Sequence, residues 1–230
     1  MGRIIIDNID MHFEKKQIKN MYIRVISPGG KIKITAPLSA SEDEIKNFAL
    51  SKISWVKKRQ KKLADKPRPA ELNYETGELL WLLGKQYPLI VNHGGVNKAF
   101  VKEPEIILQI RNNTSKAARK KIIEEWYRDV LKKVIPIVAG KWEKTIGVKA
   151  AEWRIQNMRT KWGTCNIRER RIVVNLHLAK RSPDCLEFVI IHELIHLLEK
   201  SHGVKFKKYM DAYCPNWKAI RKSLSVSLPN

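Results

Sequence analysis

The sequence Ile191-His192-Glu193-Leu194-Ile195-His196 holds two histidines four residues apart, with a glutamate directly after the first. Four residues advance an α-helix by about 400°, so both imidazoles lie on one face and can reach one ion at about 2.0–2.1 Å. Glu193 lies about 100° round from His192, where it can flank the metal and take a proton from bound water. The stretch predicts a helix that carries hydrolytic zinc, with His192 and His196 as ligands and Glu193 as general base.

The residues before this stretch favour a buried helix. Ser182-Pro183-Asp184 offers an N-cap hydroxyl, a proline at the first helical position and an acid near the positive end of the helix dipole. We therefore expect the helix to begin near Pro183. The alternative is a core helix with two hydrogen-bonded histidines, and it is less favoured because three buried polar groups would all need partners without a metal.

A catalytic zinc commonly takes three protein ligands and one water, so a third ligand should follow. Glu199 lies seven residues after His192 and about 10.5 Å further along the helix axis, too far for one ion to bridge. His202 can bind only if the helix ends before it and the chain turns back. Lys200 and Gly203 favour such an end, Gly203 by permitting a positive φ. His202 is the predicted third ligand of one zinc ion per chain.

The composition indicates a basic globular chain. Its 230 residues, 43% of them hydrophobic, can bury a sizeable core. The formal net charge of +22 would attract a polyanion such as DNA, RNA or a nucleotide, although solvated helix faces explain the same charge equally well. No apolar run approaches about 18 residues, and charge appears too early for a signal peptide, so we expect a cytoplasmic protein without membrane association.

Hydrophobic periodicity predicts an α+β chain in two parts. A β-rich region with one helix is expected over residues 1–114, and a metal-binding domain that includes a long bridging helix over residues 115–230. The elements expected in the first part are a hairpin over residues 20–36, a capped helix over 41–63, a loop or linker at 66–69, and strands over 77–91 and 100–110.

The second part begins with an amphipathic helix that should start at Ser115 and end near Gly147. Residues 152–156 and 171–176 then indicate strands around a turn-rich segment at 159–166. We interpret these strands as a hairpin that leads into the metal helix. Its edge could pair with an extended peptide substrate.

Several of these stretches together resemble the YgjP-like metal-dependent hydrolases, which are relatives of the SprT-like and WLM zinc peptidases. The stretches that carry the resemblance are Arg159-Thr160-Lys161-Trp162-Gly163-Thr164-Cys165, Val174-Asn175-Leu176, the sequence from Val189 to Leu197, and Ser201-His202 with Phe206. Further likeness at residues 33–37, 55–56, 77–78 and 83–87 extends it over nearly the whole chain. The resemblance implies a minimal zincin-like fold, a small sheet packed on the metal helix, with the three histidines on zinc and Glu193 as base.

Two residues near the motifs carry no predicted function. Family members often have Trp where His177 stands, so we interpret His177 as a residue on the surface of the sheet. Cys165 is interpreted as a small buried residue, because free cysteine commonly behaves as a small hydrophobe. The three cysteines are widely spaced and predict neither a disulfide framework nor a cysteine zinc site.

The leading hypothesis is a zinc-dependent metallopeptidase that acts on a peptide or protein substrate, in which Glu193 deprotonates a zinc-activated water. Arg159, Tyr209 and Tyr213 are candidates for contacts to the substrate or transition state. One alternative keeps the metal and takes a nucleotide or another phosphate substrate. A second is a basic nucleic-acid-associated protein with structural zinc. Both rank lower, because phosphoryl chemistry often recruits two metals and a structural zinc needs a fourth protein ligand.

Overall fold

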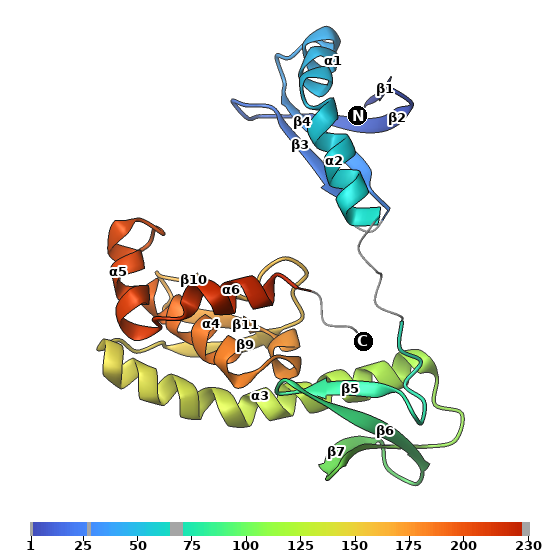
Figure 1. Ribbon diagram of the computed structural model, residues 1–230, viewed down its shortest axis with the longest axis vertical. Coiled ribbons are helices and arrows are strands. Elements are labelled where there is room, and N and C mark those ends of the chain that lie inside the picture. Colours follow the sequence, from blue (N-terminus) through green and yellow to red (C-terminus); the bar gives the residue numbers. More distant parts are fainter. Residues whose placement is uncertain (1, 27–28, 65–70, 227–230) are drawn as a thin grey trace. The chain divides into compact units, whose positions relative to one another are not determined.

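The computed structural model describes residues 2–26, 29–64 and 71–226, and it separates the chain into two compact units, Met1–Arg68 and Pro69–Asn230 (Figure 1). This division differs from the predicted boundary between residues 114 and 115. The strands over residues 79–110 share one hydrophobic core with the long helix that follows, which places them in the second unit. The linker predicted at residues 66–69 lies outside the described residues.

The first unit is a four-stranded sheet in the order β1-β2-β4-β3 with two helices packed on it. Strands β3 and β4 form the predicted antiparallel pair, while β2 runs parallel to β4. Alternate residues of β4, among them Ile32 and Ile34, are fully buried against the helices. The elements are β1 (Gly2–Ile6), β2 (Ile9–Lys16), β3 (Tyr22–Ile26), β4 (Lys31–Pro37), α1 (Glu42–Ser51) and α2 (Ile53–Ala64). The first two strands had no counterpart among the predicted elements.

The helix expected over residues 41–63 is two helices. It begins with the predicted capping box, in which the Ser41 hydroxyl accepts from the Glu44 amide and the Glu44 carboxylate accepts from the Ser41 amide. It is interrupted at Lys52, where the amide bonds back to Ala49. The Ser51 hydroxyl donates to the Phe48 carbonyl at 2.8 Å, and such side-chain bonds compete with the helical pattern.

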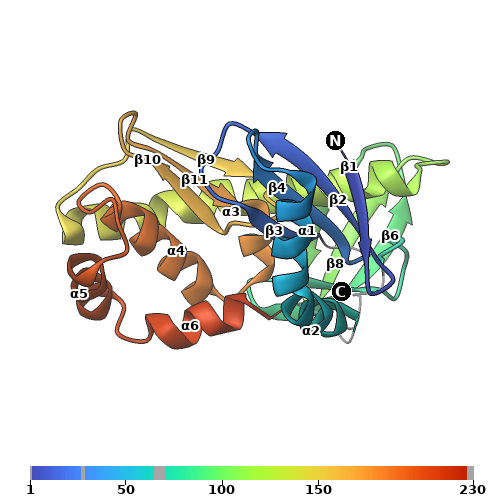
Figure 2. The ribbon, with the colours of Figure 1, turned by 90° about the horizontal axis from the view of Figure 1, so that it is seen from above.

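The second unit contains two sheets that both contact α3, one through β7 and β8 and the other through hydrogen bonds to β9 (Figures 1 and 2). One has the order β5-β6-β8-β7 and the other β10-β11-β9. The elements are β5 (Leu79–Leu82), β6 (Lys85–His93), β7 (Lys98–Lys102), β8 (Glu105–Ile110), α3 (Lys116–Ile146), β9 (Glu152–Gln156), β10 (Gly163–Asn166), β11 (Arg171–Asn175), the 3₁₀ helix η1 (Leu176–Lys180), α4 (Pro183–Ile195), α5 (Val204–Tyr213) and α6 (Trp217–Leu224).

Helix α3 has the predicted bounds. The Ser115 hydroxyl caps its first turn, Pro136 lies within it, and Gly147 ends it in the left-handed conformation at φ 76°. The helix contacts both α4 and strand β7 of the β5-β6-β8-β7 sheet, so it joins the part of this unit that holds α4 to the part that holds this sheet. Among the described residues, no helix has the length and apolarity needed to cross a membrane.

The sheet beside α4 differs from the predicted hairpin. Strands β9 and β11 run parallel, and the antiparallel hairpin is formed by β10 and β11. The segment at residues 159–166, expected to be a turn, therefore contributes an edge strand. The reversal occurs after Asn166, whose side chain accepts from the Glu169 amide and closes a tight turn before β11.

Candidate metal centre

Helix α4 is buried on nearly all sides. It begins at Pro183, as predicted, and its buried residues include Ile190, Ile191 and Leu194. The Ser182 hydroxyl does not cap it, because this hydroxyl lies 3.4 Å from the Cys185 sulfur. A polar side chain on such a helix needs a hydrogen-bond partner, a metal or a cavity, because burying it without one is costly.

The turn between β5 and β6 packs closely against the residues that precede α4. The Leu83 amide donates to the Ala179 carbonyl at 2.8 Å. Gly84 has φ +84°, and a Cβ there would lie 2.9 Å from the Cα of Ser182. Only glycine therefore allows this turn to approach the helix start so closely.

Helix α4 ends where the predicted third ligand requires it to end. Its last residue is Ile195, His196 is the C-cap, and a short turn leads to His202 before α5 starts at Val204. The expected positive φ at Gly203 is wrong, since this glycine is the extended N-cap of α5 with φ −69°. The reversal is made instead by the turns at residues 196–198 and 201–203.

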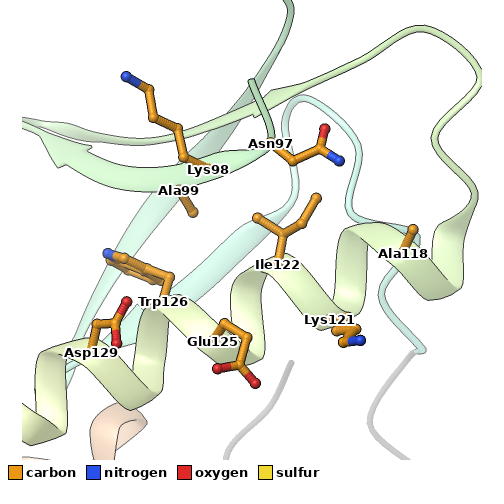
Figure 3. A pocket seen from close by; sticks show the side chains of 9 residues that line it. All are labelled: Asn97, Lys98, Ala99, Ala118, Lys121, Ile122, Glu125, Trp126 and Asp129. Atoms are coloured by element: carbon orange, nitrogen blue, oxygen red, sulfur yellow. The ribbon is translucent and has the colours of Figure 1, made fainter. Parts of the chain in front are cut away.

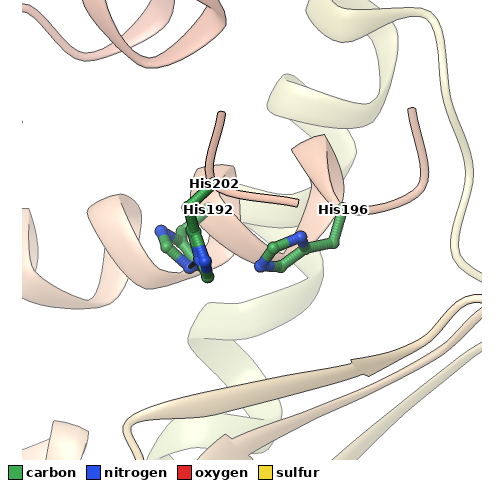
Figure 4. Close-up of side chains that lie close together, drawn as sticks. All are labelled: His192, His196 and His202. Carbon is green, nitrogen blue, oxygen red and sulfur yellow. Dashed lines mark hydrogen bonds between the residues drawn. The ribbon is translucent and has the colours of Figure 1, made fainter. Parts of the chain in front are cut away.

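The three histidines come together with their ring nitrogens facing one another (Figure 4). One ligand nitrogen from each of His192, His196 and His202 lies within 4.8 Å of the other two. The Nε2 atoms of His192 and His202 are 3.0 Å apart. Nitrogens that share one tetrahedral zinc at about 2.0–2.1 Å lie about 3.4 Å apart, so this cluster has the right dimensions for one ion.

Two contacts fix the orientation of the imidazoles. The His196 Nδ1–H donates to the Glu199 carbonyl at 3.1 Å, which leaves Nε2 as the acceptor nitrogen of that ring. The buried Phe206 of α5 packs against all three rings, with centroid separations of 4.9, 4.9 and 4.7 Å from His192, His196 and His202. Glu199 thus contacts the site through its backbone carbonyl. Its carboxylate accepts from the Ser201 amide and hydroxyl, and it is not part of the histidine cluster.

The surroundings of His192 and His196 favour the neutral form of the imidazole, which is the form that binds metals. Burial, reinforced by the neighbouring His196 and His202, lowers the pKa of His192 to about 3. Burial also lowers the pKa of His196, although its bond to the Glu199 carbonyl opposes the shift. A lone pair is therefore available on these rings at neutral pH.

Glu193 lies on the other side of the cluster, against the edge strand β10. Its side chain is 5% exposed, and burial raises the pKa of its carboxyl group to about 8, while the nearby Lys161 opposes the shift. A Cβ at Gly163 would lie 2.6 Å from the Glu193 Oε1 atom. Glycine at the start of β10 is therefore required for this carboxylate to occupy its position.

The loop before β10 is held by the buried Asn175. Its amide donates to the carbonyls of Met158 and Lys161 at 2.8 and 2.7 Å, and its oxygen accepts from the His177 amide. The backbone N–H of Asn175 also donates to the Trp162 carbonyl at 2.9 Å. One side chain at the end of β11 thus fixes the loop that borders Glu193.

A cavity of about 580 Å³ opens beside His192, Glu193 and His202. The loop residues Thr160 to Gly163 form one wall, and α6 forms another through Arg221, Leu224 and Ser225. Arg221 is exposed and close enough to His192 to contribute to its lowered pKa. The sequence arguments missed Arg221, because nothing in the basic run at the end of the chain distinguishes it from Lys218 or Lys222.

The other predicted contact residues lie elsewhere. Arg159 lines a separate cavity with His177, and Tyr213 lines one with Trp142 and Glu187. Tyr209 stacks on Tyr213 with ring centroids 6.3 Å apart. None of the three lines the cavity beside the histidines, so their proposed role in substrate binding stays a prediction.

His177 and Cys165 also differ in part from their interpretation. His177 belongs to η1 and is half-buried in a cavity, so the predicted place on the sheet surface is wrong. It lies two residues after the end of β11, and its backbone N–H donates to the Asn175 side-chain oxygen where the chain leaves the sheet. Cys165 is half-buried on β10, and burial raises the pKa of its thiol to about 11.

A further cavity of about 390 Å³ lies between β7 and α3 (Figure 3). Ile122 and Trp126 of α3 face Ala99 of β7 across it. Its two carboxylates are engaged on their own helix, Glu125 with Arg128 and Asp129 with Lys132. No histidine or cysteine lines this cavity, so it offers no comparable donor set for a transition metal.

Comparison with known proteins gives a family and two similar structures. Residues 19–227 match the family described as YgjP-like, metallopeptidase domain. The zymogen of Pyrococcus abyssi abylysin, a metallopeptidase, is 16% identical with a TM-score of 0.37, covering 39% of this chain and 90% of that one. The metallopeptidase zymogen jannalysin of Methanocaldococcus jannaschii is 20% identical with a TM-score of 0.36, covering 39% and 92%. No curated protein matches the chain.

Proposed function

The chain belongs to the YgjP-like metallopeptidase family, and from this membership we propose that it is a single-zinc peptidase whose centre is built by His192, His196 and His202. The observation that carries the proposal is the convergence of three imidazole nitrogens within 4.8 Å beside a buried carboxylate and a cavity. Three neutral nitrogen donors suit zinc, and three protein ligands leave one coordination position for a reactant.

The residues present fit this metal. The 3.0 Å contact between the Nε2 atoms of His192 and His202 requires one of the two rings to carry the proton, and an ion shared by both nitrogens would replace that contact. When bound there, zinc would supply a Lewis acid that polarises a carbonyl and acidifies water. Phe206 and the Glu199 carbonyl hold the rings in place, as supporting contacts do at histidine metal sites.

Glu193 is the proposed general base. Its Oε1 lies at the wall of the cavity beside Gly163, where it can accept a proton from water and later release it to the leaving amine. Burial keeps this carboxyl group out of bulk water and raises its pKa, which strengthens it as a proton acceptor.

The proposed substrate is an extended peptide. Among the strands of the described residues, β10 pairs with β11 alone in the order β10-β11-β9, so its other edge can bond to a peptide backbone next to Glu193. The cavity wall adds apolar surface from Trp162, Phe188 and Leu224. Arg221 on α6 is placed to pair with an anionic group of the substrate or of the transition state.

The experiment that tests the proposal compares two substitutions on the same helix. Glu193→Gln should keep about one zinc per chain and lower peptide turnover by at least about 100-fold, because the water loses its proton acceptor. The matched control is Glu187→Gln, since this carboxylate instead accepts from the Trp142 indole at 2.7 Å and Lys141. Zinc content and cleavage of a quenched peptide library are measured for both. Undiminished turnover in Glu193→Gln would remove this residue from the mechanism.

A hydrolase of phosphate compounds is the alternative at the same centre. Such enzymes often use two metal ions held by several carboxylates. Within the described ranges, the three histidines are the one group of potential ligands, and Glu193 is the one carboxylate at their cavity. Zinc-dependent release of phosphate from nucleoside triphosphates without cleavage of any peptide would overturn the peptidase proposal.

A further inference from the structure

A second cavity of about 590 Å³ lies in the same unit between α3 and η1. Its lining comes from four segments of the chain: the stretch before β5, helix α3, the residues after β9, and η1. The charged or titratable residues in this lining are Glu71, Lys116, Lys120, Glu124, Arg159, His177 and Lys180, together with Tyr74 and Tyr127. No metal-cluster histidine is among them, so this is a site separate from the metal centre.

The cations of this cavity exceed its carboxylates. Glu71 lies 3.4 Å from the Lys116 ammonium, and Glu124 accepts from the Asn157 amide at 3.3 Å. In the described part of the chain, no carboxylate lies within 4.0 Å of Lys120, Arg159 or Lys180. Three positive side chains thus line one cavity without an ion-pair contact, and Glu124 is the carboxylate of the lining that attracts Lys180.

Lys180 shows how unfavourable this arrangement is without a ligand. Its ammonium lies 5.6 Å from the centroid of the Tyr127 ring, and burial lowers its pKa although Glu124 opposes the shift. The neighbouring His177 has its pKa lowered to about 4 by burial and by the charges of Lys180 and Lys120. A partly desolvated cation with like charges around it is costly, and an anion among these groups would remove that cost.

We propose that this cavity is a binding site for a small phosphate-bearing anion. Ammonium groups from Lys120 and Lys180 and the forked guanidinium of Arg159 match phosphate oxygens, and the volume exceeds that of one phosphate, which favours a ligand with several phosphates or a phosphate on a larger body. The loop that carries Arg159 continues into the wall of the metal cavity and is clamped by Asn175, so a ligand here borders the peptidase site without entering it.

The test titrates the metal-loaded full chain with inorganic tripolyphosphate in 150 mM salt and measures heat. Lys180→Met and Lys120→Met should each weaken a one-to-one association by about tenfold or more, because each removes a charge-assisted contact. Lys121→Met is the matched control, since Lys121 is the next residue of α3 and lines the cavity beside β7 instead. Lys120 is exposed, so its variant remains informative if Lys180→Met does not fold.

Two further arms identify the ligand class and the place of binding. Citrate should bind at least about tenfold more weakly than tripolyphosphate, and equal affinity would overturn the assignment to phosphate. His202→Asn should bind tripolyphosphate as the wild type does, and lost binding there would move the anion to the metal. The proposal is also overturned if the wild type shows no saturable binding, or if Lys121→Met weakens binding as much as Lys120→Met.

Discussion

Two cavities of similar size, about 580 and 590 Å³, share the loop between β9 and β10, yet their linings favour opposite charges. The first gathers three imidazoles next to a buried carboxyl group, with burial lowering the pKa of His192, and it is suited to a cation. The second gathers more cations than carboxylates, and within the described residues Lys120, Arg159 and Lys180 have no ion-pair partner, so it is suited to an anion. The difference shows that donor chemistry and local charge, not volume, decide what each cavity can bind.

The largest expected difference between the two cavities is in zinc affinity, and it is measured by removing one histidine from each. His202→Ala should lower zinc affinity by at least about 100-fold, because even the loss of a residue that merely supports a ligand costs 10–100-fold. His177→Ala should leave zinc affinity unchanged, since this imidazole lines the other cavity. Competition with a chromophoric chelator measures both. Equal losses in the two variants would contradict the separation of the sites.

A second substitution leaves the ligands intact and displaces the carboxylate. Gly163→Ala puts a Cβ 2.6 Å from the Glu193 Oε1 atom, so the side chain must move. Peptide turnover should fall by about 100-fold while zinc stays bound, because small displacements of a catalytic group have effects of this size. Gly140→Ala on α3, where a Cβ meets no atom within 4 Å, should retain turnover. Zinc loss in parallel with activity would refute this interpretation of Gly163.

The shared loop is tested at Asn175. Asn175→Ala removes bonds from a buried side chain to the Met158 and Lys161 carbonyls and should lower the free energy of unfolding by about 3 kcal/mol, because both carbonyls lose their donor and a space is left in the protein. Asn157→Ala, an exposed residue of the same loop, should change it by less than about 0.5 kcal/mol. Urea unfolding of the metal-free variants measures both, and similar values for the two would show that Asn175 does not hold the loop.

The smallest expected effect is a dependence on pH in the cationic cavity. The pKa of His177 is about 4 in the folded protein against an ordinary value of 6.5. Above pH 6.5 both states are neutral; as the pH falls from 6.5 to about 4, the unfolded chain binds a proton that the folded protein does not, so stability declines. His177→Gln should therefore lose less stability over this window in thermal unfolding. A steeper loss of stability in His177→Gln than in the wild type between pH 6.5 and about 4 would contradict a lowered pKa of His177.

Local rules made much of the candidate site predictable. The spacing of His192 and His196, the start of α4 at Pro183, and the need for the helix to end before His202 all follow from helical geometry and terminal residues. The same rules give α3 its bounds at Ser115 and Gly147. These features depend on residues close in sequence, which is why the sequence alone is sufficient for them.

Features that depend on distant contacts were not predictable. The parallel pairing of β9 with β11, the contact of Gly163 with Glu193, and the place of Arg221 beside the histidines each join segments far apart along the chain. The sequence indicates a loop or linker at residues 66–69, but not that strands β5 to β8 belong with α3, because these strands gain their core from a helix that follows them in the chain.

The most direct test of the central claim, that three histidines hold one catalytic zinc with an open position, is X-ray absorption spectroscopy of the zinc-loaded protein. We expect three imidazole nitrogens and one water oxygen at about 2.0–2.1 Å from the zinc, and one imidazole fewer in His202→Ala. A sulfur at about 2.3 Å, or an unchanged imidazole count in His202→Ala, would contradict the account.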